Sequence, residues 1–258
     1  MGRQARQKSS KGLYHCIIRG VDKQNIFNDN IDRKKFIKIL KEVKNKHDFN
    51  LIAYCLMSNH VHIIIEDYNN ILDKIMKSIE VSYSYYYNQK YERTGHFFEN
   101  RYLSKNIEDD GYLLRAVRYV HQNPEKSGIG KTENYRWSSY KEYIYSTEII
   151  NSNLVLQVLN DDLKKAKEMF SKYNLENKKP SYTGDYVEFE MVNRLTDNQA
   201  QIIIKNTINI DNINNIKKYN IHIRDEYLRK IKKIKGITDV QISRITGISK
   251  YIIEKLIM

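Results

Sequence analysis

The sequence predicts an α+β fold, with a ferredoxin-like, RNA-recognition-like antiparallel sheet and helices on one face. The order of apolar patterns along residues 1–145 is β-α-β-β-α-β, followed by one further helix. Residues 226–258 then return to short, regularly spaced apolar positions, which indicate additional α-helices.

Four apolar runs are expected as strands. Residues 12–20 form a β-rich run that ends at a glycine, and residues 50–57 and 60–66 form two more. The pair Ser58-Asn59 between the last two is short enough for a hairpin turn. Residues 97–104 follow a glycine-bearing turn and are expected as the fourth strand.

Three amphipathic helices connect or follow these strands. The first begins at the capping pair Asp29-Asn30, and the second has its apolar positions between residues 71 and 83. The third begins at Asp109-Asp110 and is expected to end before Pro124, because the residue before a proline avoids the helical conformation.

The chain is expected to contain three segments. Residues 1–145 form the α+β domain, 146–225 a helical linker or accessory region, and 226–258 a helix-turn-helix tail that binds DNA. In the tail, Lys250 and Tyr251 would project from the second short helix toward DNA. A small helical hairpin without DNA-binding function has the same apolar pattern and stays open as an alternative.

The net charge of +13 points to a polyanionic partner, nucleic acid first and an anionic membrane surface second. No apolar run reaches the roughly 18 residues of a membrane span, and no secretory signal is recognisable, so no membrane partner is expected. Cys16 and Cys55 lie in apolar runs and are interpreted as buried thiols in a reducing compartment, which predicts a cytoplasmic protein.

The pair His60 and His62 is the sharpest local feature. On a strand, residues two apart point to the same face, so both imidazoles can bind one divalent ion. Taken alone, such a pair is more often structural.

Tyr119 and Asn123 lie four residues apart and share one helix face, about 6 Å apart along the axis. The amide oxygen of Asn123 can complete a metal shell, which would place Tyr119 one turn away as a nucleophile. Tyr112 is nearly on the same face and is the rival nucleophile. Alternatively, Asn123 only ends a helix before proline, and Tyr119 is one core aromatic among twenty-one tyrosines.

Six ordered segments together resemble the single-tyrosine HUH transposases, and within them most closely the proteins associated with repetitive extragenic palindromes. The segments are LYHCIIRG (13–20), MSNHVH (57–62), TGHFFENRY (94–102), YLL (112–114), RYVHQNP (118–124) and YRWSSY (135–140). The C-terminal tail is similar to the helix-turn-helix of the chromosomal replication initiator.

The resemblance implies a metal site at His60, His62 and Asn123, a nucleophile at Tyr119, and Mg²⁺ or Mn²⁺ as the ion. Manganese fits these ligands better, because imidazole suits softer metals and magnesium prefers oxygen. The implied reaction is cleavage and rejoining of single-stranded, hairpin-bearing DNA through a 5′-phosphotyrosine, without a nucleotide cofactor.

A free phenol has a pKa of about 10, so the nucleophile must lose a proton, and the sequence identifies no base for it. His121 points about 200° away round the helix. Basic side chains are expected to hold the DNA strand electrostatically: Arg19, Arg101, Arg115 and Arg118.

The resemblance also implies a bacterial, nucleoid-associated protein and a possible homodimer, since some relatives exchange the tyrosine helix. Two other functions stay open: a catalytically idle protein that binds palindromic DNA, and an RNA-binding module, because this sheet topology also serves RNA.

Overall fold

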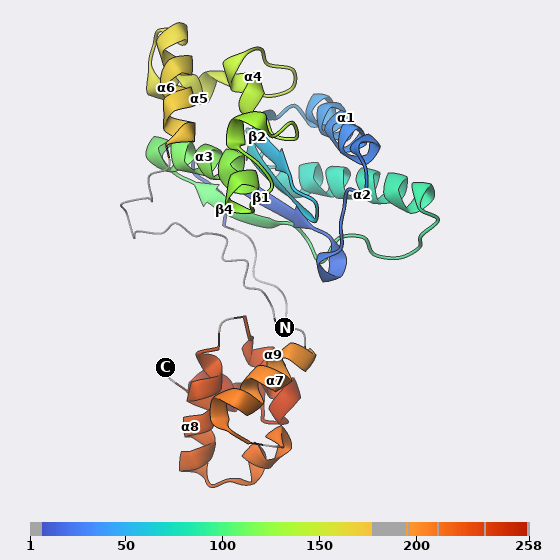
Figure 1. The fold of residues 1–258 in the computed structure, drawn as a ribbon, viewed down its shortest axis with the longest axis vertical. Helices are drawn as coiled ribbons and strands as arrows, with labels where there is room; N and C mark the ends of the chain where they lie inside the picture. Colours follow the sequence, from blue (N-terminus) through green and yellow to red (C-terminus); the bar gives the residue numbers. More distant parts are fainter. Residues whose placement is uncertain (1–6, 177–194, 196, 211, 235, 257–258) are drawn as a thin grey trace. The chain divides into compact units, whose positions relative to one another are not determined.

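The computed structural model describes residues 7–176, 195, 197–210, 212–234 and 236–256. Contacts divide the chain into two units, Met1–Asn177 and Lys178–Met258 (Figure 1). Each unit has its own hydrophobic core and is described by itself.

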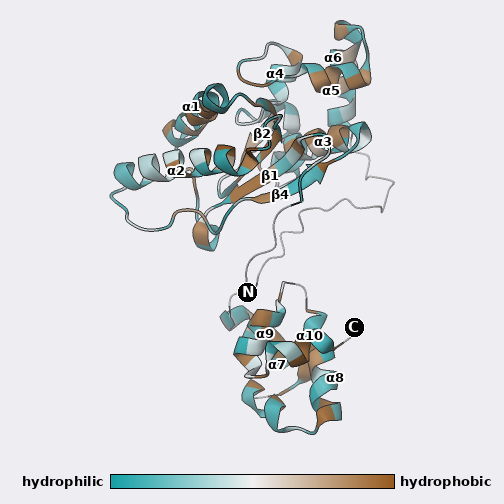
Figure 2. Ribbon diagram, turned by 180° about the vertical axis from the view of Figure 1, so that it is seen from behind, coloured by the Kyte–Doolittle hydropathy of each residue, from teal (hydrophilic) through white to brown (hydrophobic). Residues whose placement is uncertain are grey.

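The first unit is built on a four-stranded sheet with the order β2-β3-β1-β4, in which all neighbours are antiparallel. The strands are β1 (Leu13–Arg19), β2 (Asn50–Leu56), β3 (His60–Glu66) and β4 (Leu103–Ile107). The sequence of β2 is apolar at nearly every position, and Figure 2 shows it in the hydrophobic colour. A strand of this kind is buried on both faces, so both faces of the sheet need cover.

Helices provide this cover from both sides. The two helices inside the β-α-β-β-α-β order, α1 (Asn30–His47) and α2 (Leu72–Lys90), lie on one face, as predicted (Figure 1). The further helix α3 (Asp110–Lys126) lies on the opposite face, which corrects the expectation that all helices share one face. The unbroken apolar character of β2 is the physical reason.

Two predicted boundaries differ from the structure. The fourth strand runs over Leu103–Ile107 and not 97–104, because Phe97 and Phe98 both pack their rings beside Tyr83 and the backbone turns at Asn100 with φ 127°. The third helix continues past Pro124 for two residues to Lys126, where backbone hydrogen bonds from 127–129 close its last turn. A proline near the end of a helix removes only one internal hydrogen bond.

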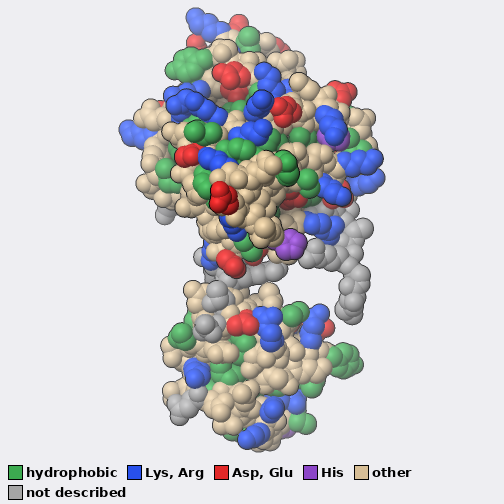
Figure 3. All heavy atoms as spheres, turned by 90° about the vertical axis from the view of Figure 1, so that its right-hand side faces the viewer, with side chains coloured by type: hydrophobic (Ala, Val, Ile, Leu, Met, Phe, Trp, Pro, Cys, Tyr) green, Lys and Arg blue, Asp and Glu red, His purple; other side chains and the backbone are tan. Residues whose placement is uncertain are grey.

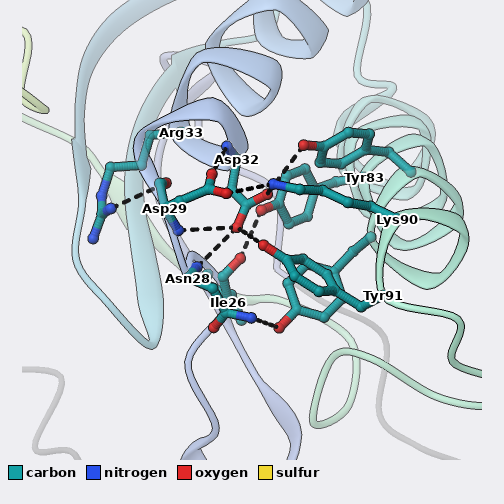
Figure 4. A network of polar contacts seen from close by, with 10 residues as sticks. Ile26, Asn28, Asp29, Asp32, Arg33, Tyr83, Lys90 and Tyr91 are labelled. Atoms are coloured by element: carbon teal, nitrogen blue, oxygen red, sulfur yellow. Dashed lines mark hydrogen bonds and ion pairs between the residues drawn. The ribbon is translucent and has the colours of Figure 1, made fainter.

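A buried carboxylate joins the start of α1 to the end of α2. Asp29 is the N-cap of α1, and its side chain accepts a hydrogen bond from the Asp32 amide. The side chain of Asp32 is fully buried and accepts hydrogen bonds from Lys90 Nζ at 2.6 Å and Tyr91 Oη at 2.8 Å (Figure 4). Burial raises the pKa of Asp32, but the hydrogen bonds from Lys90, Tyr91, the Asn28 amide and Tyr86 outweigh it and hold the pKa below its usual value.

Three more helices complete the first unit: α4 (Tyr140–Ile144), α5 (Asn153–Leu159) and α6 (Leu163–Leu175), with short 3₁₀ turns at Val21–Lys23 and Thr132–Asn134. Tyr143 on α4 stacks on Phe170 of α6 with ring centroids 4.2 Å apart, and its hydroxyl donates to the Ile52 carbonyl of β2. These contacts tie α4 and α6 to the edge of the sheet.

The second unit is helical in its described residues. It contains α7 (Asp197–Ile208), a 3₁₀ turn (Ile213–Lys218), α8 (Ile221–Lys232), α9 (Asp239–Thr246) and α10 (Lys250–Lys255). Gly247 ends α9 in the left-handed region with φ 69°, a conformation that favours glycine, and α10 begins three residues later. The two short helices predicted for the tail are therefore present.

The helices do not divide between the two units at the predicted domain boundaries, residues 145 and 225. Helices α5 and α6 contact α3 and belong to the first unit, whereas α7 contacts α8 and α9 and belongs to the second. The middle of the predicted linker, 177–194, lies outside the described residues. None of the described helices is long and apolar enough to cross a bilayer.

We predict that Asp32→Asn lowers the unfolding free energy of the first unit by about 3 kcal/mol or more, because it leaves buried donors facing an amide. Trp137, the sole tryptophan of the chain, packs against the core of this unit, so its fluorescence during urea unfolding measures the effect. The control is Glu42→Gln, which breaks the exposed Lys38–Glu42 pair and should change stability by less than about 0.5 kcal/mol. An Asp32→Asn protein as stable as this control would contradict the role given to Asp32.

Candidate active site

The sheet places His60 and His62 side by side on the face that α3 covers. Both lie on β3, two residues apart, so their side chains share a face. Their rings are buried, with 5% and 2% of the residues exposed, and the ring centroids are 4.9 Å apart. The predicted convergence of the two imidazoles is present in the structure.

Each of these histidines is held through Nδ1. His60 Nδ1 lies 2.7 Å from the Asn59 side-chain oxygen, and His62 Nδ1 lies 3.0 Å from Nε2 of His15. The Nε2 atoms of His60 and His62 are buried and have no hydrogen-bond partner in the described part of the chain. Two orphaned imidazole nitrogens on one face fit the donors that a divalent metal ion requires.

Burial keeps the site's histidines neutral. It lowers the pKa of His60 to about 4 and that of His62 well below its usual value, with a further contribution from the Arg19 charge in both cases. Burial, with the charge of Lys105, lowers the pKa of His15 to about 3. At neutral pH each imidazole therefore has one nitrogen with a lone pair, as a metal ligand must.

Helix α3 brings Tyr119 and Asn123 to the histidines. Asp109 caps the helix by accepting the Tyr112 amide, and the helix then runs across the histidine face of the sheet. The Tyr119 ring centroid lies 5.5 Å from that of His62, at an angle of 82° between the planes. Asn123 is buried beside the His62 ring, and its Nδ2 donates to the Tyr119 carbonyl at 2.8 Å, an arrangement that leaves its Oδ1 on the histidine side.

The opposite side of α3 is fastened to α6 and to the chain before α4. His121 Nε2 lies 2.9 Å from Ser139 Oγ, and Nδ1 lies 3.2 Å from Asn174 Oδ1. His121 is fully buried there, which agrees with the sequence argument that it points away from Tyr119. Arg118 donates to the Glu176 carbonyl and lies over the ring of Tyr173, so its guanidinium is engaged by α6.

Arg19 lies at the end of β1, directly across from His60. Its Nε and Nη2 atoms are buried and have no hydrogen-bond partner in the part of the chain that the structure describes. Burial lowers the pKa of Arg19, while Glu99 and Tyr119 raise it, so the guanidinium lies close enough to both to feel their charge. A half-buried cation beside the tyrosine and the histidine pair can bind an anionic group.

The other residues predicted to contact DNA are exposed or engaged by neighbouring side chains. Arg101 is exposed, and Arg115 lies over the ring of Tyr112 at 5.7 Å. Lys105 lies over the same ring at 5.4 Å, and burial raises the pKa of Tyr112 to about 12. In the second unit, Lys250 forms an ion pair with Glu254 at 2.8 Å, and Tyr251 is 63% exposed.

Among the described residues, no three His, Cys, Asp or Glu side chains are grouped to hold a metal ion. The groups on β3 and α3 that could hold a metal ion are the imidazoles of His60 and His62 and the amide oxygen of Asn123. Neither His15 nor the role of Asn59 is predicted from the sequence. Period-two spacing puts His15 on the same face of β1 as Arg19, but only the register of β1 against β3 brings it to His62.

Residues 8–123 match the sequence profile of the family described as "Transposase IS200 like". Over this segment the chain is similar to the IS200-like transposases, and the segment contains the whole sheet, Tyr119 and Asn123.

Two solved structures are similar to the chain at low identity. One is a REP-associated tyrosine transposase bound to a REP hairpin, with 14% identity, a TM-score of 0.45, and coverage of 59% of this chain and 90% of that chain. The other is a protein of Deinococcus radiodurans R1 named as a transposase, with 13% identity, a TM-score of 0.34, and coverage of 47% and 97%. No curated protein matches the chain.

Proposed function

We propose that the protein cleaves and rejoins single-stranded DNA through a covalent bond between Tyr119 and a 5′-phosphate. The observation that carries the proposal is the pair of orphaned, buried Nε2 atoms of His60 and His62 facing a helix that presents Tyr119 and Asn123. The match of residues 8–123 to the IS200-like transposases supports a DNA-processing reaction at this site.

His60, His62 and Asn123 would hold a divalent metal, for which Mn²⁺ fits two imidazoles and an amide better than Mg²⁺ does. When bound, the ion supplies Lewis-acid chemistry, drawing charge from a phosphate oxygen and orienting the scissile phosphate. The two imidazoles are preorganised for this purpose, because their Nδ1 atoms are already engaged by Asn59 and His15.

Tyr119 Oη attacks phosphorus in this reaction, and the bond from phosphorus to the 3′ oxygen breaks. The phenol loses its proton, the leaving 3′ oxygen gains one, and the phosphate stays on the tyrosine as a 5′-phosphotyrosine. Attack by a 3′-hydroxyl reverses the step and rejoins the strand. Lys126 Nζ lies 4.6 Å from the Tyr119 ring centroid, and its positive charge stabilises the phenolate form.

Arg19 is the residue that we assign to the scissile phosphate. Its two unpartnered nitrogens would donate to phosphate oxygens. A planar guanidinium can form two parallel hydrogen bonds to two oxygens of one phosphate. Glu99 and Tyr119 favour the charged form of Arg19 and raise its pKa, against the effect of burial. It would stabilise the negative charge that grows on the phosphate during attack.

The proposed substrate is hairpin-bearing single-stranded DNA, which rests on the motifs shared with palindrome-associated transposases. The net charge of +13 supports an extended polyanion, and Lys and Arg side chains are spread over the face drawn in Figure 3. Such a substrate would place the protein at the bacterial nucleoid in the cytoplasm. A homodimer stays a prediction.

We predict that Tyr119→Phe abolishes covalent adducts, because it removes the attacking oxygen and keeps the ring. The assay incubates the protein with labelled hairpin DNA and Mn²⁺ and detects denaturant-resistant complexes on a gel. The control is Tyr112→Phe, which should form adducts like the unaltered protein. Adducts that survive Tyr119→Phe and vanish in Tyr112→Phe would overturn the assignment.

The same assay distinguishes the other candidate functions. Tight hairpin binding without any metal-dependent adduct would indicate an idle palindrome-binding protein. Preference for an RNA hairpin of the same sequence would indicate an RNA-binding module.

We predict that Arg19→Gln slows adduct formation at saturating DNA by a factor of about 100, as expected for a lost charged donor at the reacting group. Single-turnover rates on labelled hairpin DNA measure it. The control is Arg101→Gln, which removes an exposed arginine and should weaken DNA binding with little change in this rate. Equal rates in the two variants would show that Arg19 acts only in binding.

Helices α9 and α10 are proposed to bind DNA as a helix-turn-helix, through Lys250 and Tyr251. We predict that Lys250→Gln reduces the salt dependence of hairpin binding by about one unit of log K against log salt. The control is Lys230→Gln on α8, because Lys230 and Glu226 form an ion pair of the same i,i+4 kind. An equal change in both variants would argue against a specific role of α10.

A further inference from the structure

We propose that His15 is a positioning residue that holds His62 in the tautomer whose Nε2 can bind the metal. The inference rests on the proposed function, because it assigns a role toward the same metal site. The role explains why a polar residue is buried at position 15, where neither the cleavage chemistry nor the hydrophobic core requires a histidine. The supporting observations are a strand register, a hydrogen bond and an orphaned nitrogen.

The register of β1 against β3 brings the two histidines together. Ile17 is the direct partner of His62, so His15 is its diagonal neighbour on the same face of the sheet. His15 Nε2 lies 3.0 Å from His62 Nδ1, and 4% of His15 is exposed. The His15 ring is also 5.9 Å from that of Tyr119, so it fills the space between sheet and α3 behind the proposed metal ligand.

One proton lies between the two rings, and its position decides whether His62 can bind a metal. A neutral imidazole has one N–H and one lone pair. If His62 Nδ1 donates to His15 Nε2, the buried Nε2 of His62 has the lone pair that a metal requires. If His15 donates instead, His62 Nε2 has the proton and cannot bind a metal without a rearrangement of both rings.

His60 shows the same arrangement with a partner that can only accept at this position. Its Nδ1 lies 2.7 Å from the side-chain oxygen of Asn59, so the proton lies on Nδ1 and the lone pair on the orphaned Nε2. His15 would accept the Nδ1 proton of His62, as Asn59 accepts the Nδ1 proton of His60. Partners of this kind behind a histidine ligand fix its tautomer and ring orientation.

The first test is Mn²⁺ binding by the full-length protein without DNA, measured from the electron paramagnetic resonance signal of free Mn²⁺. His15→Phe keeps a ring and removes the acceptor, and it should weaken Mn²⁺ binding by about 10- to 100-fold. His15→Gln retains an acceptor oxygen and should stay within about threefold of the unaltered protein. The control is His47→Gln, which removes a hydrogen-bonded histidine of α1, on the other face of the sheet, and should leave Mn²⁺ affinity unchanged.

The outcomes separate the inference from the proposed function. Loss of Mn²⁺ binding in His62→Gln together with unchanged binding in His15→Phe would overturn the role of His15 and leave the metal site standing. Failure of the unaltered protein to bind Mn²⁺ would overturn both.

A second measurement does not depend on a substitution that can impair folding. Long-range ¹H–¹⁵N correlation spectra of the unaltered protein report which ring nitrogen of each histidine has the proton, and His62→Gln assigns the signal. We expect the proton of His62 on Nδ1. A proton on Nε2 of His62 would overturn the inference.

Discussion

Burial of an imidazole pair between the sheet and α3 is the constraint on which the rest of the first unit depends. An imidazole without hydrogen-bond partners is unfavourable in a dry interior, so the site must engage one nitrogen of each ring and leave the other for a ligand. Asn59 and His15 engage the Nδ1 atoms, and α3 supplies the cover that removes water. The orphaned Nε2 atoms are then a local instability that a bound ion would relieve.

This constraint explains why α3 is fastened so strongly on its other side. A helix that covers polar atoms gains less from burial than one that covers aliphatic side chains. Hydrogen bonds on the other side of the helix compensate for this loss. They join Arg118 and Gln122 to the end of α6, and His121 to Ser139. Helix α6 is therefore part of the support of the active site, although it lies more than forty residues beyond Tyr119 in the sequence.

The sequence predicts those features that depend on local spacing. His60 and His62 share a face because a strand alternates, and Tyr119 and Asn123 share a face because a helix returns after four residues. The order of strands and two of the helices followed from apolar periodicity in the same way. The fourth strand was misplaced because Phe97 and Phe98 look like a strand in sequence, whereas both rings turn into the α2 core.

What the sequence could not predict depends on register. Arg19 and His15 reach the site because β1 pairs with β3 so that Arg19 lies opposite His60. A shift of one residue would turn both side chains to the other face. Asn174 and Glu176, which hold α3, lie outside any motif and are found only in the folded structure.

The charges of the site also fit together in one scheme. Its histidines are neutral because they are buried, so before any ligand binds the positive charge near Tyr119 lies on side chains such as Arg19 and Lys126. Positive charges near Tyr119 stabilise both a phenolate and a neighbouring phosphate, although these two anions repel each other. A divalent ion held by His60, His62 and Asn123 would add positive charge that offsets this repulsion. The buried, neutral state of the histidines is thus what allows a site rich in basic groups to accept a metal cation as well.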